Sequence, residues 1–244
     1  MMLKKHTLEK YLQGLLAGNR PACRAVIEET LQSGVPANNV YMDVIWPIMV
    51  EIDKLYDQHR INATQQAFAT RINHTIVDQL QNKLPRKPQT CKKIVVCCSA
   101  NQQAELGGQM ITDLFESDGW ETRFLGGDVN NDDILAFVHS YHPDILLLHG
   151  IKPKAAPQVR KLIDSIKTVN AWPDMKVMLA GGVFDRADGL WEEIGADLHA
   201  STAAEAVRIV SADAGDIPKP QRTIKCRKTK NAKAAESTRQ TTSA

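Results

Sequence analysis

The chain has 244 residues, of which 43% are hydrophobic and 24% are charged, and its formal net charge is +2. This composition is typical of a globular protein with room for one large or two modest domains. The five cysteines form no pair of C-x-x-C motifs, so we expect no zinc site. No apolar run approaches the roughly 20 residues of a membrane span, and no signal peptide is recognisable. We therefore expect a cytoplasmic protein without membrane contact.

Helical periodicity dominates residues 1–84, which we predict to form a four-helix domain. Apolar residues recur at helical spacing in four segments, which are residues 8–16, 22–32, 38–58 and 63–84. Pro47 lies inside the third segment and should kink that helix or mark a junction in it. The short connections between the segments favour a small antiparallel bundle.

Residues 85–93, PRKPQTCKK, are predicted to be a linker, because the hydrophobic period changes after them. Short apolar runs then alternate with helical segments, and the runs are residues 94–98, 120–125, 144–148, 176–180 and 197–200. This alternation is typical of an α/β domain with a parallel sheet. With right-handed crossovers it predicts a flavodoxin-like, doubly wound sheet of five strands over residues 94–213.

The last segment, residues 214–244, is basic and has almost no apolar periodicity. From Gly215 onward, eight Lys or Arg residues stand against two Asp or Glu residues. We expect this segment to be a disordered basic tail, since it buries too little apolar surface to offset its ordering entropy. Such a tail can contact nucleic-acid phosphates, or it can serve solubility or partner binding. Without a helix-turn-helix or zinc module, we expect no direct nucleic-acid binding.

Ligands of open α/β sheets bind at the carboxyl ends of the strands. Three predicted loops meet there, namely residues 99–108, 148–154 and 180–183. Their glycines would let the backbone approach a bulky ligand closely, although each could equally serve a tight turn; the relevant positions are Gly107, Gly150, Gly181 and Gly182. No nucleophile–base pair, P-loop or metal-ligand cluster is recognisable, so we expect no enzymatic activity.

Several motifs follow one another in a particular order along residues 94–213. They are the loop ending in Gly107, Leu-Gly-Gly-Asp-Val at 125–129, Pro-Asp-Ile at 143–145, Gly181-Gly182, Ile-Gly-Ala-Asp at 194–197 and Ala-Ala-Glu-Ala at 203–206. This layout resembles the cobalamin-binding domain of methionine synthases, corrinoid methyl carriers and cobalamin-sensing regulators. The preceding four helices resemble the cap that covers the upper face of cobalamin in that family. The resemblance implies cobalamin as the cofactor, with heme as the alternative.

The loop that carries the cobalt ligand in this family departs from its usual pattern, D-x-H-x-x-G. Aligned on Gly107, Gln102 replaces the aspartate and Ala104 replaces the histidine. An alanine methyl group has no lone pair, so we expect no metal ligand from this loop. The amides of Gln102 and Gln103 can instead hydrogen-bond the amide side chains of a corrin, or they can belong to a solvated loop.

The same resemblance gives expectations for the upper face of the cofactor. It implies that Trp46 lies over that face as an aromatic ring. It also places Gln66 and Ala67 where cobalamin sensors have a Glu-His pair, so that the histidine position is again an alanine.

His149 matches the small residue, usually serine, that lines the channel for the nucleotide tail of cobalamin in this family. Three roles remain open for it. It could hydrogen-bond the tail or its phosphate, it could ligate the metal of a different tetrapyrrole such as heme, or it could be an ordinary histidine satisfied by the backbone. Gly150 and Ile151 follow it in the same predicted loop and are candidate cofactor contacts.

Together these features indicate a non-catalytic sensor or regulator that binds cobalamin, or a related tetrapyrrole, with the benzimidazole still on cobalt. The resemblance implies a protein partner such as a transcription regulator. Two alternatives remain. One is a corrinoid methyl carrier that serves a methyltransferase, against which the alanine at position 104 argues. The other is an interaction scaffold that has lost cobalamin binding.

Overall fold

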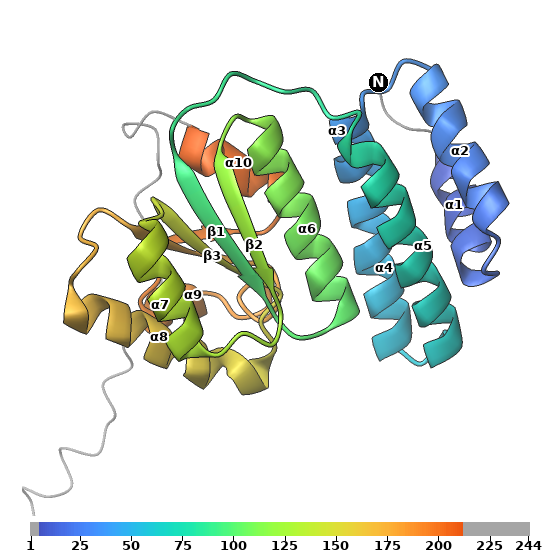
Figure 1. Ribbon diagram of the computed structural model, residues 1–244. Helices are drawn as coiled ribbons and strands as arrows, with labels where there is room; N and C mark the ends of the chain where they lie inside the picture. Colours follow the sequence, from blue (N-terminus) through green and yellow to red (C-terminus); the bar gives the residue numbers. More distant parts are fainter. Residues whose placement is uncertain (1–4, 212–244) are drawn as a thin grey trace, which may run out of the picture.

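The computed structural model describes residues 5–211, which form a helical part and an α/β part lying side by side (Figure 1). The predicted basic tail, residues 214–244, lies outside the described residues. Within residues 5–211, no helix combines the length and the apolar character needed to cross a membrane.

Four helical rods make up the first part, as the sequence predicts. The elements are α1 (Lys5–Leu16), α2 (Arg20–Gln32), α3 (Ala37–Val40), the π-helix η1 (Tyr41–Ile45), α4 (Trp46–Asp57) and α5 (Ala63–Gln81). The third rod consists of α3, η1 and α4 without a break. Its π-turn ends at Ile45, two residues before Pro47, whose ring and missing N–H are incompatible with a regular α-helical interior. The predicted junction at Pro47 is therefore present as a wider helical turn.

The second part is a parallel sheet of β1 (Lys93–Cys98), β2 (Glu121–Gly126), β3 (Ile145–His149), β4 (Lys176–Ala180) and β5 (Leu198–Ala200). The strand order β2-β1-β3-β4-β5 is that of the flavodoxin-like fold, so the predicted fold class is confirmed. The connecting helices are α6 (Gln102–Ser117), α7 (Asn131–Tyr141), the 3-10 turn η2 (Pro153–Ala155), α8 (Ala156–Val169), α9 (Leu190–Ile194) and α10 (Ala203–Ser211).

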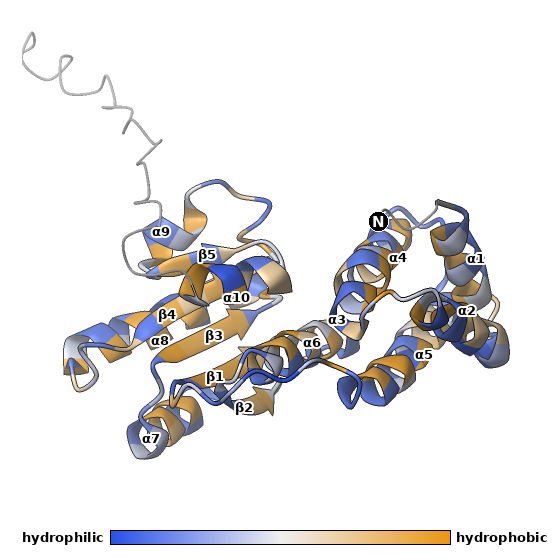
Figure 2. Cartoon of the chain, turned by 90° about the horizontal axis from the view of Figure 1, so that it is seen from above, coloured by the Kyte–Doolittle hydropathy of each residue, from blue (hydrophilic) through white to orange (hydrophobic). Residues whose placement is uncertain are grey.

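The three central strands β1, β3 and β4 are hydrophobic along most of their length, because helices cover both faces of the sheet there (Figure 2). Side chains such as Val95 and Leu146 point toward α7, α8 and α9. Their neighbours in sequence, such as Val96 and Leu147, point toward α6 and α10 and belong to the same apolar core as the interior of the four-helix part. One continuous core therefore runs from the sheet through α6 into the helical part.

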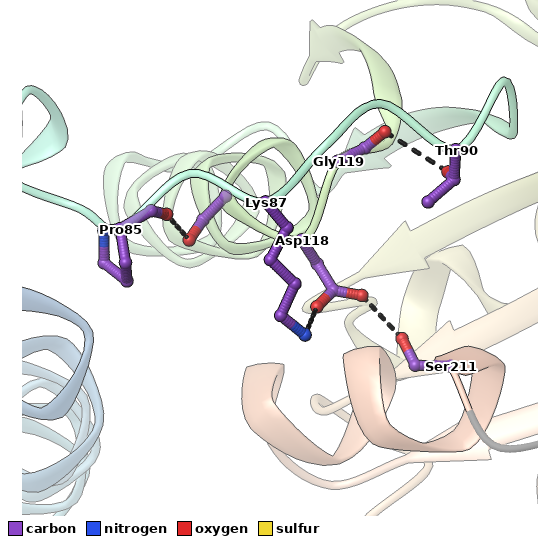
Figure 3. A network of polar contacts seen from close by, with 7 residues as sticks. Pro85, Lys87, Thr90, Asp118, Gly119 and Ser211 are labelled. Atoms are coloured by element: carbon purple, nitrogen blue, oxygen red, sulfur yellow. Dashed lines mark hydrogen bonds and ion pairs between the residues drawn. The ribbon is translucent and has the colours of Figure 1, made fainter.

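The segment between the two parts is held along its length by α6 and the residues that follow it (Figure 3). Lys87 pairs with Asp118, whose other oxygen accepts a 2.7 Å hydrogen bond from the Ser211 hydroxyl at the end of α10. Thr90 donates its backbone N–H to the carbonyl of Gly119 at 2.8 Å. Residues 85–93 were predicted as a linker, and the division of the chain into domains remains a prediction.

Replacing Gly119 with alanine is expected to lower the free energy of unfolding by roughly 2–4 kcal/mol. Gly119 has a φ of +92°, and a Cβ there would lie 2.1 Å from the carbonyl oxygen of Pro88. Gly34→Ala is the matched control, since Gly34 has a φ of +88° with open space around the added carbon. Urea unfolding of both variants measures the difference. Equal losses would show that residues 85–93 yield easily to the added methyl group.

Candidate functional site

The carboxyl ends of the three central strands lie in register at the point where the strand order reverses. Cys98 of β1 pairs with His149 of β3, which pairs with Ala180 of β4. The change of direction between β1 and β3 is the topological switch point, where ligands of this fold class bind. His149 is thus the side chain placed at the centre of the candidate site.

His149 is buried, with 6% of its surface exposed, and the backbone satisfies one of its ring nitrogens. Its Nδ1 lies 3.0 Å from the carbonyl oxygen of Ala180. Because a carbonyl only accepts, Nδ1 carries the proton and donates it, and Nε2 keeps its lone pair. Burial lowers the pKa of His149 from 6.5 to about 4, although the hydrogen bond to Ala180 and the nearby Asp185 oppose this shift. The imidazole is therefore neutral at physiological pH.

Two glycines leave the space that the His149 ring fills. A Cβ on Gly107 of α6 would lie 2.2 Å from Nε2, and a Cβ on Gly181 would lie 3.3 Å from Cε1. Nε2 therefore faces the backbone of α6 and is not presented to a metal. In this conformation His149 follows the third role expected from the sequence, that of a histidine satisfied by the backbone.

The predicted loop over residues 99–108 is wrong for most of its length, because α6 begins at Gln102. Asn101 caps the helix, with its side-chain oxygen accepting a 3.0 Å hydrogen bond from the N–H of Ala104. Ala104 is buried, and a Cβ on Gly150 would approach its methyl group to 2.8 Å. A small residue at 104 lets this first turn pack onto the end of β3, so a capped helix replaces the expected polar loop.

The other predicted contacts lie around this closed centre. Gln102 is exposed, and its carbonyl lies 3.0 Å from Nε2 of His74 on α5, while Gln103 is half-buried. Ile151 is buried, with 6% of its surface exposed. A Cβ on Gly182 would come within 2.7 Å of the Ile151 backbone, so that these two loops lie against each other.

The helical part contacts the strand ends directly. Trp46 has 7% of its surface exposed, and its ring centroid lies 5.7 Å from that of His149. Trp46 and His149 are thus in direct contact where the helical part meets the strand ends. Farther out, Asp57 of α4 lies 3.8 Å from Arg186 in the loop after β4. This exposed ion pair is a second link between α4 and the sheet.

Gln66 of α5 points toward α4, where its Nε2 lies 3.4 Å from Oδ1 of Asp53. Burial raises the pKa of Asp53 to about 6, and the neighbouring Asp57 adds to the increase. The structure therefore places Gln66 beside the acidic pair Asp53 and Asp57 of α4.

A polar seam between the two parts escaped the sequence analysis. The Tyr41 hydroxyl of η1 donates to Asp113 of α6 at 2.9 Å, and Gln81 donates to the same carboxyl group at 3.0 Å. Burial raises the pKa of Asp113 to about 6. The available signal was an acidic residue on the apolar face of α6, between Ile111 and Leu114.

Comparison with protein families matches most of the chain in two segments. Residues 7–81 match a model described as a B12 binding domain, and residues 92–210 match a second model with the same description. The chain therefore belongs to the cobalamin-binding protein family, and cobalamin is the cofactor of its domains, as the sequence analysis expected.

Two curated relatives come from Methanosarcina acetivorans. Monomethylamine corrinoid protein 2 is 22% identical over 85% of this chain and 97% of its own length. Monomethylamine corrinoid protein 1 is 19% identical with the same coverage. The solved structure of the Methanosarcina barkeri monomethylamine corrinoid protein aligns with a TM-score of 0.74 and 19% identity, covering 85% of this chain and 98% of that one. At this identity the structural match establishes the fold.

The residues at the strand ends do not fit a cobalamin whose benzimidazole has been replaced by a protein imidazole. The position of the ligating histidine is Ala104, whose methyl group packs on Gly150. The position that the resemblance assigns to the border of the nucleotide channel is His149, whose ring fills the space beside Gly107. Ala104 has no lone pair, and the unprotonated Nε2 of His149 faces the backbone of Gly107.

Proposed function

We propose that this protein is a non-catalytic corrinoid-binding protein that holds cobalamin between its helical cap and its sheet, with the benzimidazole on cobalt. We further propose that it presents the corrinoid to a methyltransferase. The cap comprises the helices from α1 to α5. Cobalamin supplies the metal-centred methyl chemistry in such a pair, and this chain supplies the binding surface.

The observation that carries the binding mode is the packing of Ala104 onto Gly150 in the first turn of α6. This contact occupies the place from which the family's lower ligand comes, and it is closed by a hydrogen-bonded helix cap at Asn101. Nothing in that turn can donate a lone pair to cobalt. Of the remaining expected contacts, Gln102 and Gln103 would supply hydrogen bonds at the edge of the ring, and Gly182 and Ile151 would supply shape below it. Trp46 would cover the ring once its contact with His149 opens.

Support for a carrier over a sensor comes from the relatives that match the chain along nearly its whole length. Both are named as corrinoid proteins of monomethylamine, which is a methylated amine. No feature of the described residues favours a transcription regulator as the partner. The methyl carrier, which was the alternative in the sequence analysis, is therefore the better-supported function.

The binding mode is tested by adding hydroxocobalamin, adenosylcobalamin and hemin separately to the purified protein and removing the excess. We expect both cobalamins to be retained with the absorption spectrum of the base-on form, and hemin to be lost. A base-off spectrum would contradict the mode, and the absence of any retained chromophore would contradict cobalamin binding.

A carrier and a sensor are distinguished by their response to light and by the reactivity of the bound methyl group. Illumination of the adenosylcobalamin complex is expected to leave the assembly state unchanged in sedimentation velocity. The bound methylcobalamin should also react with a corrinoid-dependent methyltransferase at least as fast as the free cofactor. A light-dependent change of assembly together with a protected methyl group would favour the sensor instead.

A further inference from the structure

We infer that His149 is a built-in plug of the nucleotide channel and sets the corrinoid specificity of the site. The protein would then bind corrinoids without drawing their lower base into the fold. This inference rests on the proposed function for its ligand class, although its structural half is testable without any ligand.

The imidazole has the properties of a fixed plug. It is 6% exposed and neutral, and it is anchored by a 3.0 Å hydrogen bond from Nδ1 to the carbonyl of Ala180 on the neighbouring strand. It lies between β3 and α6 at the switch point of the sheet. A flat aromatic nitrogen ring is also what the lower base of cobalamin would bring to this place.

The missing side chain of Gly107 leaves the space that the His149 ring occupies. Gly107 lies inside α6 without a positive φ, so its backbone conformation does not require glycine, and alanine would favour the helix more. In this chain the glycine leaves the space that the imidazole fills, because an added Cβ would lie 2.2 Å from Nε2 of His149. The two residues therefore form a matched pair, with a missing side chain on one element and a ring on the other.

Two further contacts close the channel at its mouth. Ala104 covers Gly150 at the start of α6, and the Trp46 ring of the cap lies against the His149 ring. A nucleotide tail would have to displace the imidazole, the first turn of α6 and the cap contact together. The consequence is a site that selects corrinoids by the ring and disregards the lower base.

The structural half is tested by a double-mutant cycle on the full chain without cofactor. Gly107→Ala alone is expected to lower Tm by about 5 °C or more, because the methyl group meets the imidazole. In the His149→Ser background the same substitution should leave Tm unchanged or raise it by a few degrees. An equal loss of Tm in both backgrounds would overturn the matched pair, and with it the plug.

The specificity half compares hydroxocobalamin with diaquacobinamide, which lacks the nucleotide tail. The wild-type protein is expected to bind the two with dissociation constants within about threefold, whereas His149→Ser should favour hydroxocobalamin by at least about tenfold and turn its spectrum base-off. His199→Ser is the matched control, since His199 lies within β5, is bonded to Asp185 and is not among the residues nearest to a Cβ on Gly107. It should keep the wild-type ratio.

The experiments distinguish a failure of the proposed function from a failure of this inference. If neither corrinoid binds any of these proteins while the double-mutant cycle behaves as expected, the proposed function is wrong and the plug stands. If the corrinoids bind but His149→Ser gains no preference for the tail, the plug is overturned and corrinoid binding stands.

Discussion

Replacing Trp46 with alanine is expected to lower the free energy of unfolding by about 3–5 kcal/mol, the range for removing a buried aromatic side chain. Trp46 begins α4 directly after the π-turn and packs against His149 at a centroid distance of 5.7 Å. Its loss leaves a cavity between the cap and the strand ends and admits water to the imidazole. In consequence, the pKa of His149 should rise from about 4 toward its ordinary value.

Urea unfolding and an NMR titration of His149 measure these two effects. Trp172→Ala is the control, because Trp172 is half-buried at the opposite end of β4, where its ring contacts His139 edge to face. We expect the control to lose no more than about 1.5 kcal/mol and to leave the pKa of His149 unchanged. If both substitutions lower the free energy of unfolding by the same amount, the contact of Trp46 with His149 adds no stability to the attachment of the cap.

The stability contribution of His149 is expected to depend on pH. Burial lowers its pKa in the folded protein to about 4, whereas the unfolded chain takes up the proton near pH 6.5. Between these values the unfolded state binds more protons, so the free energy of unfolding falls as the pH falls. The loss should reach about 3 kcal/mol at pH 4, and nothing is lost above pH 6.5.

Asp113 should act in the opposite direction over the same range. Burial raises its pKa in the folded protein to about 6, so the folded state takes up the proton first as the pH falls. Its contribution is therefore fully present below about pH 4 and is lost as the pH rises through 6, again by about 3 kcal/mol. The two terms oppose each other, and the wild-type profile alone cannot separate them.

Urea unfolding of the variants between pH 4 and pH 7 separates the two contributions. The stability difference between wild type and His149→Ser should shrink by about 3 kcal/mol from pH 6.5 to pH 4. For Asp113→Asn the difference should move in favour of wild type by a similar amount. Differences that stay constant with pH would show that the two groups titrate alike in the folded and unfolded states.

The fold followed closely from hydrophobic periodicity. Predicted strands such as 176–180 coincide with the observed strand, and Pro47 correctly marked a junction in the third helical rod. Local signals suffice here, because strands buried on both faces read as continuous apolar runs between helices. Residues 99–108 were the exception. The glycine and glutamine content predicted a loop, while the Asn101 cap and the packing of Ala104 made most of it helix.

For the candidate site, the sequence predicted the chemistry of single side chains but not the contacts between them. The sequence could tell that position 104 carries no lone pair, because that is a property of one side chain. It could not tell that the ring of His149 faces Gly107, since the two residues are separated by 42 positions along the chain and meet only when α6 packs on the sheet. The bond between Tyr41 and Asp113 escaped for the same reason, because its partners belong to different parts of the chain.

By itself, the sequence determined the order of helices and strands and the family of the chain, and it predicted that the usual cobalt ligand is absent. Only the tertiary structure decided that the space behind the strand ends is filled by the protein's own imidazole and that the cap rests directly on it. The physical reason is that composition and spacing report what each side chain can do. Packing decides which side chains share a space, and therefore which ligands remain possible there.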